Sequence, residues 1–199
     1  MADQVTSIKI VLLGDSGVGK TSIVAQYVSG STPDSIKPTV GSAFFTKEIT
    51  MSGRPLELLI WDTAGQEVYR GLAPMYYRSA KIAIIVFDIT SAKSFESVSY
   101  WIKELTENVD GNLTIVVCGN KTDLEEARAV TPEIVQRKIE QVNAFYVETS
   151  ATNGQGIDRL FQLAIQRQFS QKQENQNQDE EKVDLNNTQD SNTKKKGCC

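Results

Sequence analysis

The strongest chemical signal in the sequence is the run Gly14–Thr21, which has the spacing G-x-x-x-x-G-K-[ST]. It follows the apolar run Ile8–Leu13 and precedes Lys20–Val28, which has helical spacing. Glycines let backbone N–H groups wrap closely around phosphates, and a helix N-terminus adds partial positive charge. We therefore expect a phosphate-binding loop rather than an ordinary glycine-rich turn. Lys20 is expected to reach the β- and γ-phosphates and to act in catalysis, and the Thr21 hydroxyl to bind Mg²⁺. The full set of expected phosphate ligands in this run is Ser16, Gly17, Val18, Gly19, Lys20, Thr21 and Ser22.

A second group of reactive residues lies at the end of another apolar run, in Trp61-Asp62-Thr63-Ala64-Gly65-Gln66-Glu67. The carboxyl end of a parallel strand is the side of an α/β sheet on which ligands bind. Asp62 is expected to hold Mg²⁺ through a water, the Gly65 N–H to approach a γ-phosphate, and Gln66 to orient an attacking water as a catalytic residue. Without the phosphate loop upstream, a solvated strand end would be the favoured interpretation of Asp62.

Two short motifs later in the chain point to a purine base. Asn120-Lys121-Thr122-Asp123 follows an apolar run, and the Asp123 carboxylate matches the N1–H and exocyclic amino group of guanine, a donor pair that adenine lacks. Glu148-Thr149-Ser150-Ala151 follows another such run, and its backbone N–H groups can bind guanine O6. Asn120–Asp123 alone would be interpreted as an Asx-type turn after a strand, and Glu148–Ala151 alone is a weak signal. Together they give the expected guanine-binding residues Asn120, Lys121, Asp123, Ser150 and Ala151.

Composition excludes several kinds of chemistry. The 199 residues contain no histidine, which removes Ser-His-Asp and Cys-His nucleophiles and histidine-ligated metals. Catalysis must therefore rest on positioning, fixed charge, backbone dipoles or a hard cation. The net charge of −4 does not fit a general nucleic-acid binder. The spacing of the three cysteines does not indicate a set of disulfide bonds, and no signal peptide or membrane span is apparent. We therefore expect a reducing, cytoplasmic compartment.

The elements that must position these motifs alternate between strand-like and helix-like segments. Short runs rich in Ile, Leu and Val predict strands at Ile8–Leu13, Leu58–Trp61, Ile82–Phe87, Leu113–Cys118 and Phe145–Val147. Ala43–Met51 and Leu56–Asp62 are predicted to form a hairpin connected by Ser52–Pro55. Helical spacing marks Ser94–Glu107, Thr131–Gln141 and Ile157–Phe169, the second starting with Thr131 as N-cap and Pro132 at the first helical position. This alternation predicts a three-layer α/β domain with a mainly parallel sheet.

The composition of the chain changes near Ser170. Among residues 170–199, ten are Asn or Gln, and the apolar ones are Val183, Leu185 and the two cysteines. Such a segment buries too little surface to offset the entropy lost on ordering. We therefore expect a globular domain over residues 1–169 and a disordered tail over residues 170–199.

The motifs together resemble a known family. With Thr39 between the first two of them, the phosphate loop, WDTAGQE, NKTD and ETSA closely resemble the Rab small GTPases of the Ras superfamily, over essentially all of residues 5–169. Pro38–Phe44 and Leu72–Arg78 are most similar to the early-endosomal Rab branch. The resemblance implies a P-loop NTPase G domain. Its sheet would have six strands, one of them antiparallel and contributed by Ala43–Met51, and about five flanking helices.

The resemblance also implies a function. A Rab protein binds GTP or GDP with Mg²⁺, hydrolyses GTP slowly, and recruits effectors to membranes in vesicular trafficking, here of the endosomal kind. Two switches are implied, at about residues 33–45 and 63–80, with Thr39 binding Mg²⁺ and the γ-phosphate in the GTP state. Phe44, Trp61 and Tyr76 match aromatic positions through which Rabs meet effectors. Without the resemblance, core packing would be preferred for these three.

The end of the sequence extends the resemblance to membranes. Cys198 and Cys199 match the pair that carries two geranylgeranyl groups in Rabs, and two lipid chains are what stable anchoring needs. Lys194–Lys196 would add attraction to anionic lipid. The implied partners are an exchange factor, an activating protein, a GDP-dissociation inhibitor, a prenylation escort protein and effectors, with no nucleic acid. The implied location is the cytosolic face of endosomal or other vesicle membranes.

Two positions depart from the family pattern around the base. Rabs usually place an aromatic residue, which packs on guanine, at the position of Thr32, and a lysine at the position of Thr152. Base stacking and cation–π contacts are each worth on the order of 1 kcal/mol. We therefore expect GDP release to be faster than in typical Rabs.

Two other functions compete with a GTPase switch. A metabolic P-loop kinase or ATPase is disfavoured by Asn120–Asp123 and by the lack of an Arg-rich, lid-like insertion. A binding module that has lost turnover is disfavoured by Gln66, Thr39 and Thr21.

Overall fold

The computed structural model describes residues 5–32, 39–65, 71, 73–109, 111–140 and 142–171. Several predicted features lie outside these residues: Gln66, residues 33–38 of the first switch, the Lys194–Lys196 run, and Cys198 with Cys199.

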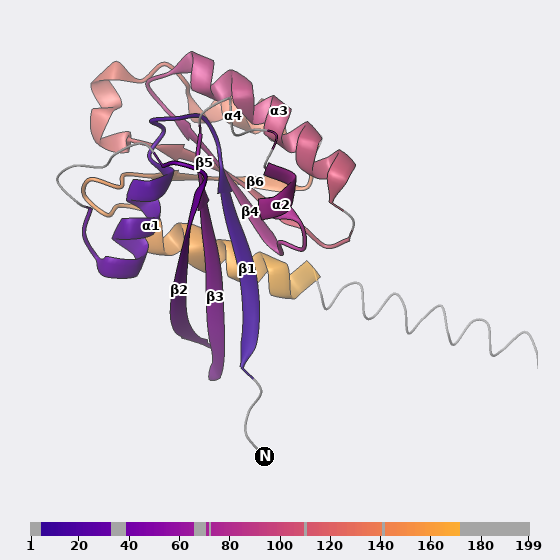
Figure 1. Cartoon of the computed structure of the whole chain (residues 1–199). Coiled ribbons are helices and arrows are strands. Elements are labelled where there is room, and N and C mark those ends of the chain that lie inside the picture. Colours follow the sequence, from indigo (N-terminus) through magenta and orange to yellow (C-terminus); the bar gives the residue numbers. More distant parts are fainter. Residues whose placement is uncertain are drawn as a thin grey trace, which may run out of the picture.

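Six strands form one sheet in the order β2-β3-β1-β4-β5-β6 (Figure 1). They are β1 (Thr6–Leu13), β2 (Ser42–Met51), β3 (Arg54–Thr63), β4 (Ile82–Asp88), β5 (Thr114–Asn120) and β6 (Ala144–Thr149). Strand β2 pairs antiparallel with β3, and every other neighbouring pair is parallel. The expected six-stranded sheet with one antiparallel strand is therefore confirmed.

Helices cover both faces of this sheet. They are α1 (Lys20–Ser29), α2 (Ala73–Tyr77), α3 (Ala92–Asn108), α4 (Pro132–Ile139) and the helical residues 157–171, with a 3₁₀ segment η2 (Thr122–Ala127) after β5. One buried cluster joins the sheet to α1 and to residues 157–165, and a second joins it to α2, α3 and α4. The predicted three-layer architecture is thus confirmed, and its two cores lie on opposite faces of the sheet (Figure 1).

The hairpin connection is shorter than predicted. Ser52 and Gly53 alone form the turn, with φ of 50° and 75°, the positive values that two-residue hairpin turns of type I′ require. Arg54 and Pro55 belong to β3, so the predicted connection Ser52–Pro55 was wrong at its end. Proline is tolerated there because β3 begins to pair with β1 only at Leu56, and the missing N–H costs no bond on that side.

The topology gathers the motifs at one edge of the sheet. Parallel strands β1, β3, β5 and β6 end on the same side of the sheet, and one of the predicted motifs lies at or directly after the carboxyl end of each. Among the described residues, no helix combines the length and the apolar character that crossing a bilayer requires.

Candidate nucleotide-binding site

The phosphate loop connects the end of β1 to the first turn of α1. Gly19 is the N-cap of α1, with a left-handed backbone (φ 99°, ψ 24°), and a Cβ on it would lie 2.3 Å from Asn120 Nδ2. Both facts require glycine at this position. In the part of the chain that the structure describes, no side chain caps the N-terminus of α1 and its first turn holds no acidic residue. The first N–H groups of the helix are therefore available to an anion.

Lys20 is buried beneath this loop. It is 5% exposed, and its Nζ donates to the carbonyl oxygens of Gly14 and Asp15, both at 2.8 Å. Burial lowers the pKa of Lys20 to about 8, although the carboxylates of Asp62 and Asp15 act in the opposite direction. The two carbonyls hold the ammonium group on the inner side of the loop, where a cation would meet phosphate oxygens.

Three oxygen-bearing side chains converge beside Lys20. Thr21 Oγ1 donates to Asp62 Oδ2 at 2.6 Å and lies 2.9 Å from Thr39 Oγ1, and Thr39 Oγ1 lies 3.4 Å from the same carboxylate oxygen. Asp62 is fully buried, and its other oxygen, Oδ1, accepts no hydrogen bond from any described residue. Burial raises the pKa of Asp62, opposed by the hydrogen bond from Thr21 and the charge of Lys20.

This convergence fits a magnesium ion. Mg²⁺ prefers oxygen ligands, and an unpartnered carboxylate oxygen buried beside two hydroxyl groups is costly unless a cation or a donor satisfies it. The described residues contain no cluster of three or more Cys, Asp or Glu side chains that could cage a metal alone. Mg²⁺ at phosphate sites is usually held by one or two carboxylates together with waters and substrate phosphates.

Gly65 brings the end of β3 against the phosphate loop. A Cβ on Gly65 would lie 2.3 Å from Asp15 O and 2.4 Å from Ser16 N, distances that real Cβ atoms do not show. Only glycine permits this approach. Gly65 therefore lies directly beside the predicted phosphate loop, where its N–H is expected to contact a γ-phosphate.

Asn120 links the phosphate loop to the predicted base loops. Its side chain is 1% exposed, and Nδ2 donates to Val18 O at 2.9 Å. Its Oδ1 accepts from Thr149 Oγ1 at 3.1 Å and from Ala151 N at 3.2 Å. One amide therefore fixes the distance between the two regions.

The remaining base residues lie on the same side. Asp123 Oδ1 accepts a hydrogen bond from Ser150 Oγ, so the two base loops meet directly. Lys121 has a left-handed backbone (φ 73°), and its Nζ lies 2.6 Å from Asp88 Oδ2. Burial alone would raise the pKa of Asp88. The hydrogen bonds from Lys121 and Thr90, together with the positive charge of Lys121, instead lower that pKa below its usual value. This ion pair holds the aliphatic stem of Lys121 beside the base loops.

Two residues that contribute to this region, Asp88 and Arg128, were not identified from the sequence. Asp88 could have been identified, because like Asp62 it is a carboxylate at the end of an apolar run. Arg128 offers no such signal. It binds Glu125 through Nε and Nη2 at 2.8 and 2.7 Å, and Glu148 through Nη1 and Nη2 at 2.8 and 3.2 Å. It thereby joins η2, which contains Asp123, to the motif that begins at Glu148.

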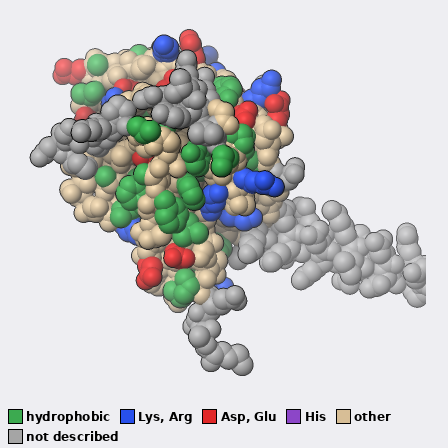
Figure 2. All heavy atoms as spheres, viewed as in Figure 1, with side chains coloured by type: hydrophobic (Ala, Val, Ile, Leu, Met, Phe, Trp, Pro, Cys, Tyr) green, Lys and Arg blue, Asp and Glu red, His purple; other side chains and the backbone are tan. Residues whose placement is uncertain are grey.

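The three aromatic residues predicted to face effectors form one surface cluster. Phe44 and Trp61 ring centres lie 5.1 Å apart, and those of Trp61 and Tyr76 lie 5.9 Å apart. Phe44 is 50% exposed, so core packing does not account for it. Hydrophobic side chains gather on this face, over the upper part of β2 and β3 (Figure 2). The exposed Val40 and Met75 come from the two predicted switches.

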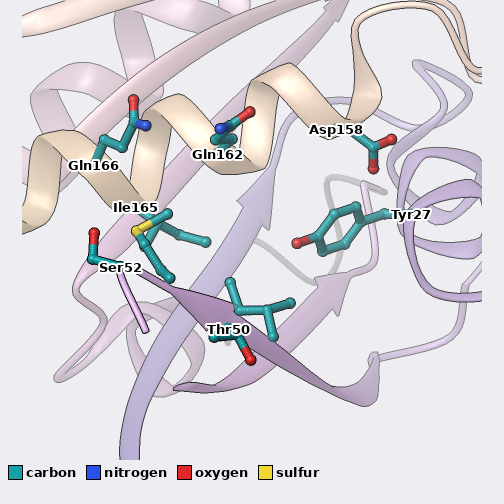
Figure 3. A pocket seen from close by; sticks show the side chains of 9 residues that line it. Tyr27, Thr50, Ser52, Asp158, Gln162, Ile165 and Gln166 are labelled. Atoms are coloured by element: carbon teal, nitrogen blue, oxygen red, sulfur yellow. The ribbon is translucent and has the colours of Figure 1, made fainter. Parts of the chain in front are cut away.

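A separate hollow lies away from these residues. A cavity of about 430 Å³ opens between the β2–β3 hairpin and the helical residues 157–171, with Tyr27 at one end (Figure 3). None of the predicted nucleotide residues lines it. The Tyr27 ring stacks on the ring of the buried Phe161, with ring centres 3.7 Å apart.

Known proteins resemble this chain along most of its length. The Ras family model matches residues 9–170. The chain is 45% identical to Ras-related protein RabJ of Dictyostelium discoideum, over 77% of this chain and 60% of RabJ. It is 40% identical to GTP-binding protein YPT53 of Saccharomyces cerevisiae, over 97% of this chain and 94% of that protein. It is 44% identical to Ras-related protein Rab-31 of Rattus norvegicus, over 83% of this chain and 84% of that protein.

Proposed function

The chain belongs to the Ras family, and we propose from that membership that it uses the site described above as a Rab-type switch in vesicular trafficking. Ras-family proteins bind GTP and GDP, and Rab proteins are small GTPases that hydrolyse GTP. The GTP state and the GDP state would differ at the two switches, which contribute Thr39 and Gly65 to the phosphate side.

The observation that carries this proposal is the position of Asn120. Its side chain bonds both the phosphate loop, at Val18, and the base loop, at Ala151. A ligand that uses both regions must therefore carry phosphates at one end and a base at the other. The Asp123 carboxylate selects guanine within that class because it accepts from two neighbouring donors.

In hydrolysis, water attacks the γ-phosphate in line with the leaving β-phosphate oxygen. The Lys20 ammonium and the N–H groups of residues 16–19 stabilise charge that develops on the phosphoryl oxygens. Gln66 would orient the water, and Thr39 would bring the first switch to the γ-phosphate. The residues proposed for catalysis, Lys20 and Gln66, do not include an arginine. An activating protein that supplies such a group would raise the rate by roughly 10³–10⁵.

The metal would be held by Thr21 and Thr39 directly and by Asp62 through a water. Mg²⁺ at this point neutralises charge on the β- and γ-phosphates. The unpartnered Asp62 Oδ1 supports this assignment.

Base selectivity tests the proposal. Wild-type protein should bind GTP and GDP in preference to ATP, measured by displacement of a fluorescent GDP analogue. Asp123→Ala should lose most of its preference for GTP over ITP, because inosine lacks the 2-amino group that the carboxylate recognises. Equal displacement by ATP and GTP in the wild type would contradict a guanine site.

We further propose how the switch reaches its membrane. Family membership supports regulators and effectors in general; an exchange factor, an activating protein, a GDP-dissociation inhibitor and an escort protein are the proposed ones. Effectors would contact Phe44, Trp61 and Tyr76. Residues 170–199 would serve as the tether that follows the domain over residues 1–169. Geranylgeranyl groups on Cys198 and Cys199 would hold the protein on the cytosolic face of endosomal or other vesicle membranes.

A further inference from the structure

The phosphate loop is held by a helix that none of the predicted motifs includes. Ser97 Oγ, on α3, donates a hydrogen bond of 2.8 Å to Asp15 Oδ2. The two residues are 82 positions apart, and the contact is partly buried. It joins the loop to α3 through one side chain of each.

The peptide group that follows Asp15 is contacted from two other directions. Lys20 Nζ donates to Asp15 O at 2.8 Å, and Gly65 packs against Asp15 O and Ser16 N closely enough to exclude a Cβ. The Asp15–Ser16 peptide therefore lies between the buried ammonium and the start of the second switch, while the Asp15 side chain is fixed to α3.

The orientation of the Asp15–Ser16 peptide determines which groups of the loop point toward a bound phosphate. This peptide carries the Ser16 N–H, a proposed phosphate donor, and the Asp15 carbonyl oxygen that accepts from Lys20. Turning the peptide would redirect both at once. Helix α3 is a firm anchor, because Phe95, Val98 and Trp101 are buried against the sheet.

We propose that Ser97 is a positioning residue for the phosphate site, acting through the Asp15 carboxylate on the Asp15–Ser16 peptide. The inference rests on the proposed function, since it assigns a further residue to the same nucleotide site. Gly65, the proposed γ-phosphate contact, packs on the same peptide. The effect of Ser97 is therefore larger on bound GTP than on bound GDP.

Nucleotide release measures this effect. Ser97→Ala should speed dissociation of a fluorescent, non-hydrolysable GTP analogue by about three- to tenfold, the change expected for losing one hydrogen bond of ordinary net strength. Release of the GDP analogue should change less. Ser97→Thr keeps the hydroxyl and should restore the wild-type rates. Ser99→Ala is the matched control, because Ser99 lies on the same helix but bonds Lys138 instead of the loop.

A double-mutant cycle separates positioning from general destabilisation. In an Asp15→Ala background, Ser97→Ala should have no further effect on GTP-analogue release, because its acceptor is gone. An equal acceleration in both backgrounds, or an equal effect of Ser99→Ala, would overturn the inference while leaving nucleotide binding intact. A wild-type chain that binds no guanine nucleotide would overturn the proposed function itself, and the inference with it.

Discussion

Asn120 shows how much of the site can depend on one buried side chain. Replacing it with alanine leaves Val18 O and Ala151 N without their partner, at a cost of about 1–3 kcal/mol for each buried group. We predict that Asn120→Ala weakens GDP binding by about ten- to a hundredfold, measured by titration calorimetry. Asn153→Ala is the control, since Asn153 is exposed and its side-chain oxygen accepts from the backbone N–H of Gln155, two residues away. Equal losses in both variants would contradict the linking role of Asn120.

Thr32 and Thr152 give a second prediction at this scale. Neither supplies an aromatic face or a long stem to guanine, and Thr152 is exposed. We predict that the double variant Thr32→Phe/Thr152→Lys slows release of a fluorescent GDP analogue by about thirtyfold, since each of the two contacts is worth on the order of 1 kcal/mol. An unchanged rate would show that these two positions do not limit nucleotide retention.

Cys118 gives a pH prediction. Burial raises the pKa of its thiol to about 12, against an ordinary value of about 8.5. Between these values the unfolded chain loses the proton and the folded chain keeps it, so the free energy of unfolding falls as pH rises above about 9. Urea unfolding at pH 8 and pH 10.5 should show a smaller decrease for Cys118→Ala than for the wild type. Equal decreases would mean that the thiol does not contribute.

At the scale of elements, the connection between η2 and β6 is the least visible from the sequence. Arg128 spans them with bonds to Glu125 and Glu148, and is itself 13% exposed at its side chain. The motifs Asn120–Asp123 and Glu148–Ala151 are 25 residues apart at their nearest positions. No local sequence pattern predicts that one arginine connects them. The linking role of Arg128 becomes apparent only in the folded structure, where β5 and β6 lie side by side.

Removing this arginine tests the connection. Arg128→Ala should lower the free energy of unfolding by about 1–2 kcal/mol, a value discounted because both glutamates are partly solvated. Arg128→Lys should recover only part of it, because an ammonium cannot bind both carboxylates in the bidentate way that a guanidinium does. Arg137→Ala, on the exposed side of α4, is the control for urea unfolding. A wild-type-like Arg128→Ala would refute the connection.

Secondary structure was predictable where the pattern was simple. The apolar runs predicted the parallel strands, because buried parallel strands are apolar on both faces. The antiparallel strand β2 was predicted from the hairpin pattern instead. Helix α4 begins as its Thr131-Pro132 signal predicts. The ends were less predictable. Asp88 and Asn120 are polar but belong to β4 and β5, since their pairing with each other continues the ladder where apolar character stops.

At the scale of the whole molecule, the sheet separates two cores and brings the motifs to one edge (Figure 1). Motif spacing predicted which residues would meet there, because parallel strands end on one side. It could not predict the contacts made from outside the motifs. Ser97 lies in α3, whose apolar pattern predicts which side chains are buried but not which polar side chains make contacts. Its hydrogen bond to Asp15 depends on how α3 packs on the sheet.

We propose that this site hydrolyses GTP with Gln66 as a catalytic residue and Mg²⁺ held by Thr21, Thr39 and Asp62. Single-turnover hydrolysis of bound GTP tests it most directly, with wild type and Gln66→Leu compared with and without Mg²⁺. We expect slow conversion of GTP to GDP and phosphate by the wild type, a rate at least tenfold lower for Gln66→Leu, and loss of activity on chelation. Equal rates for wild type and Gln66→Leu, or hydrolysis that persists without Mg²⁺, would contradict it.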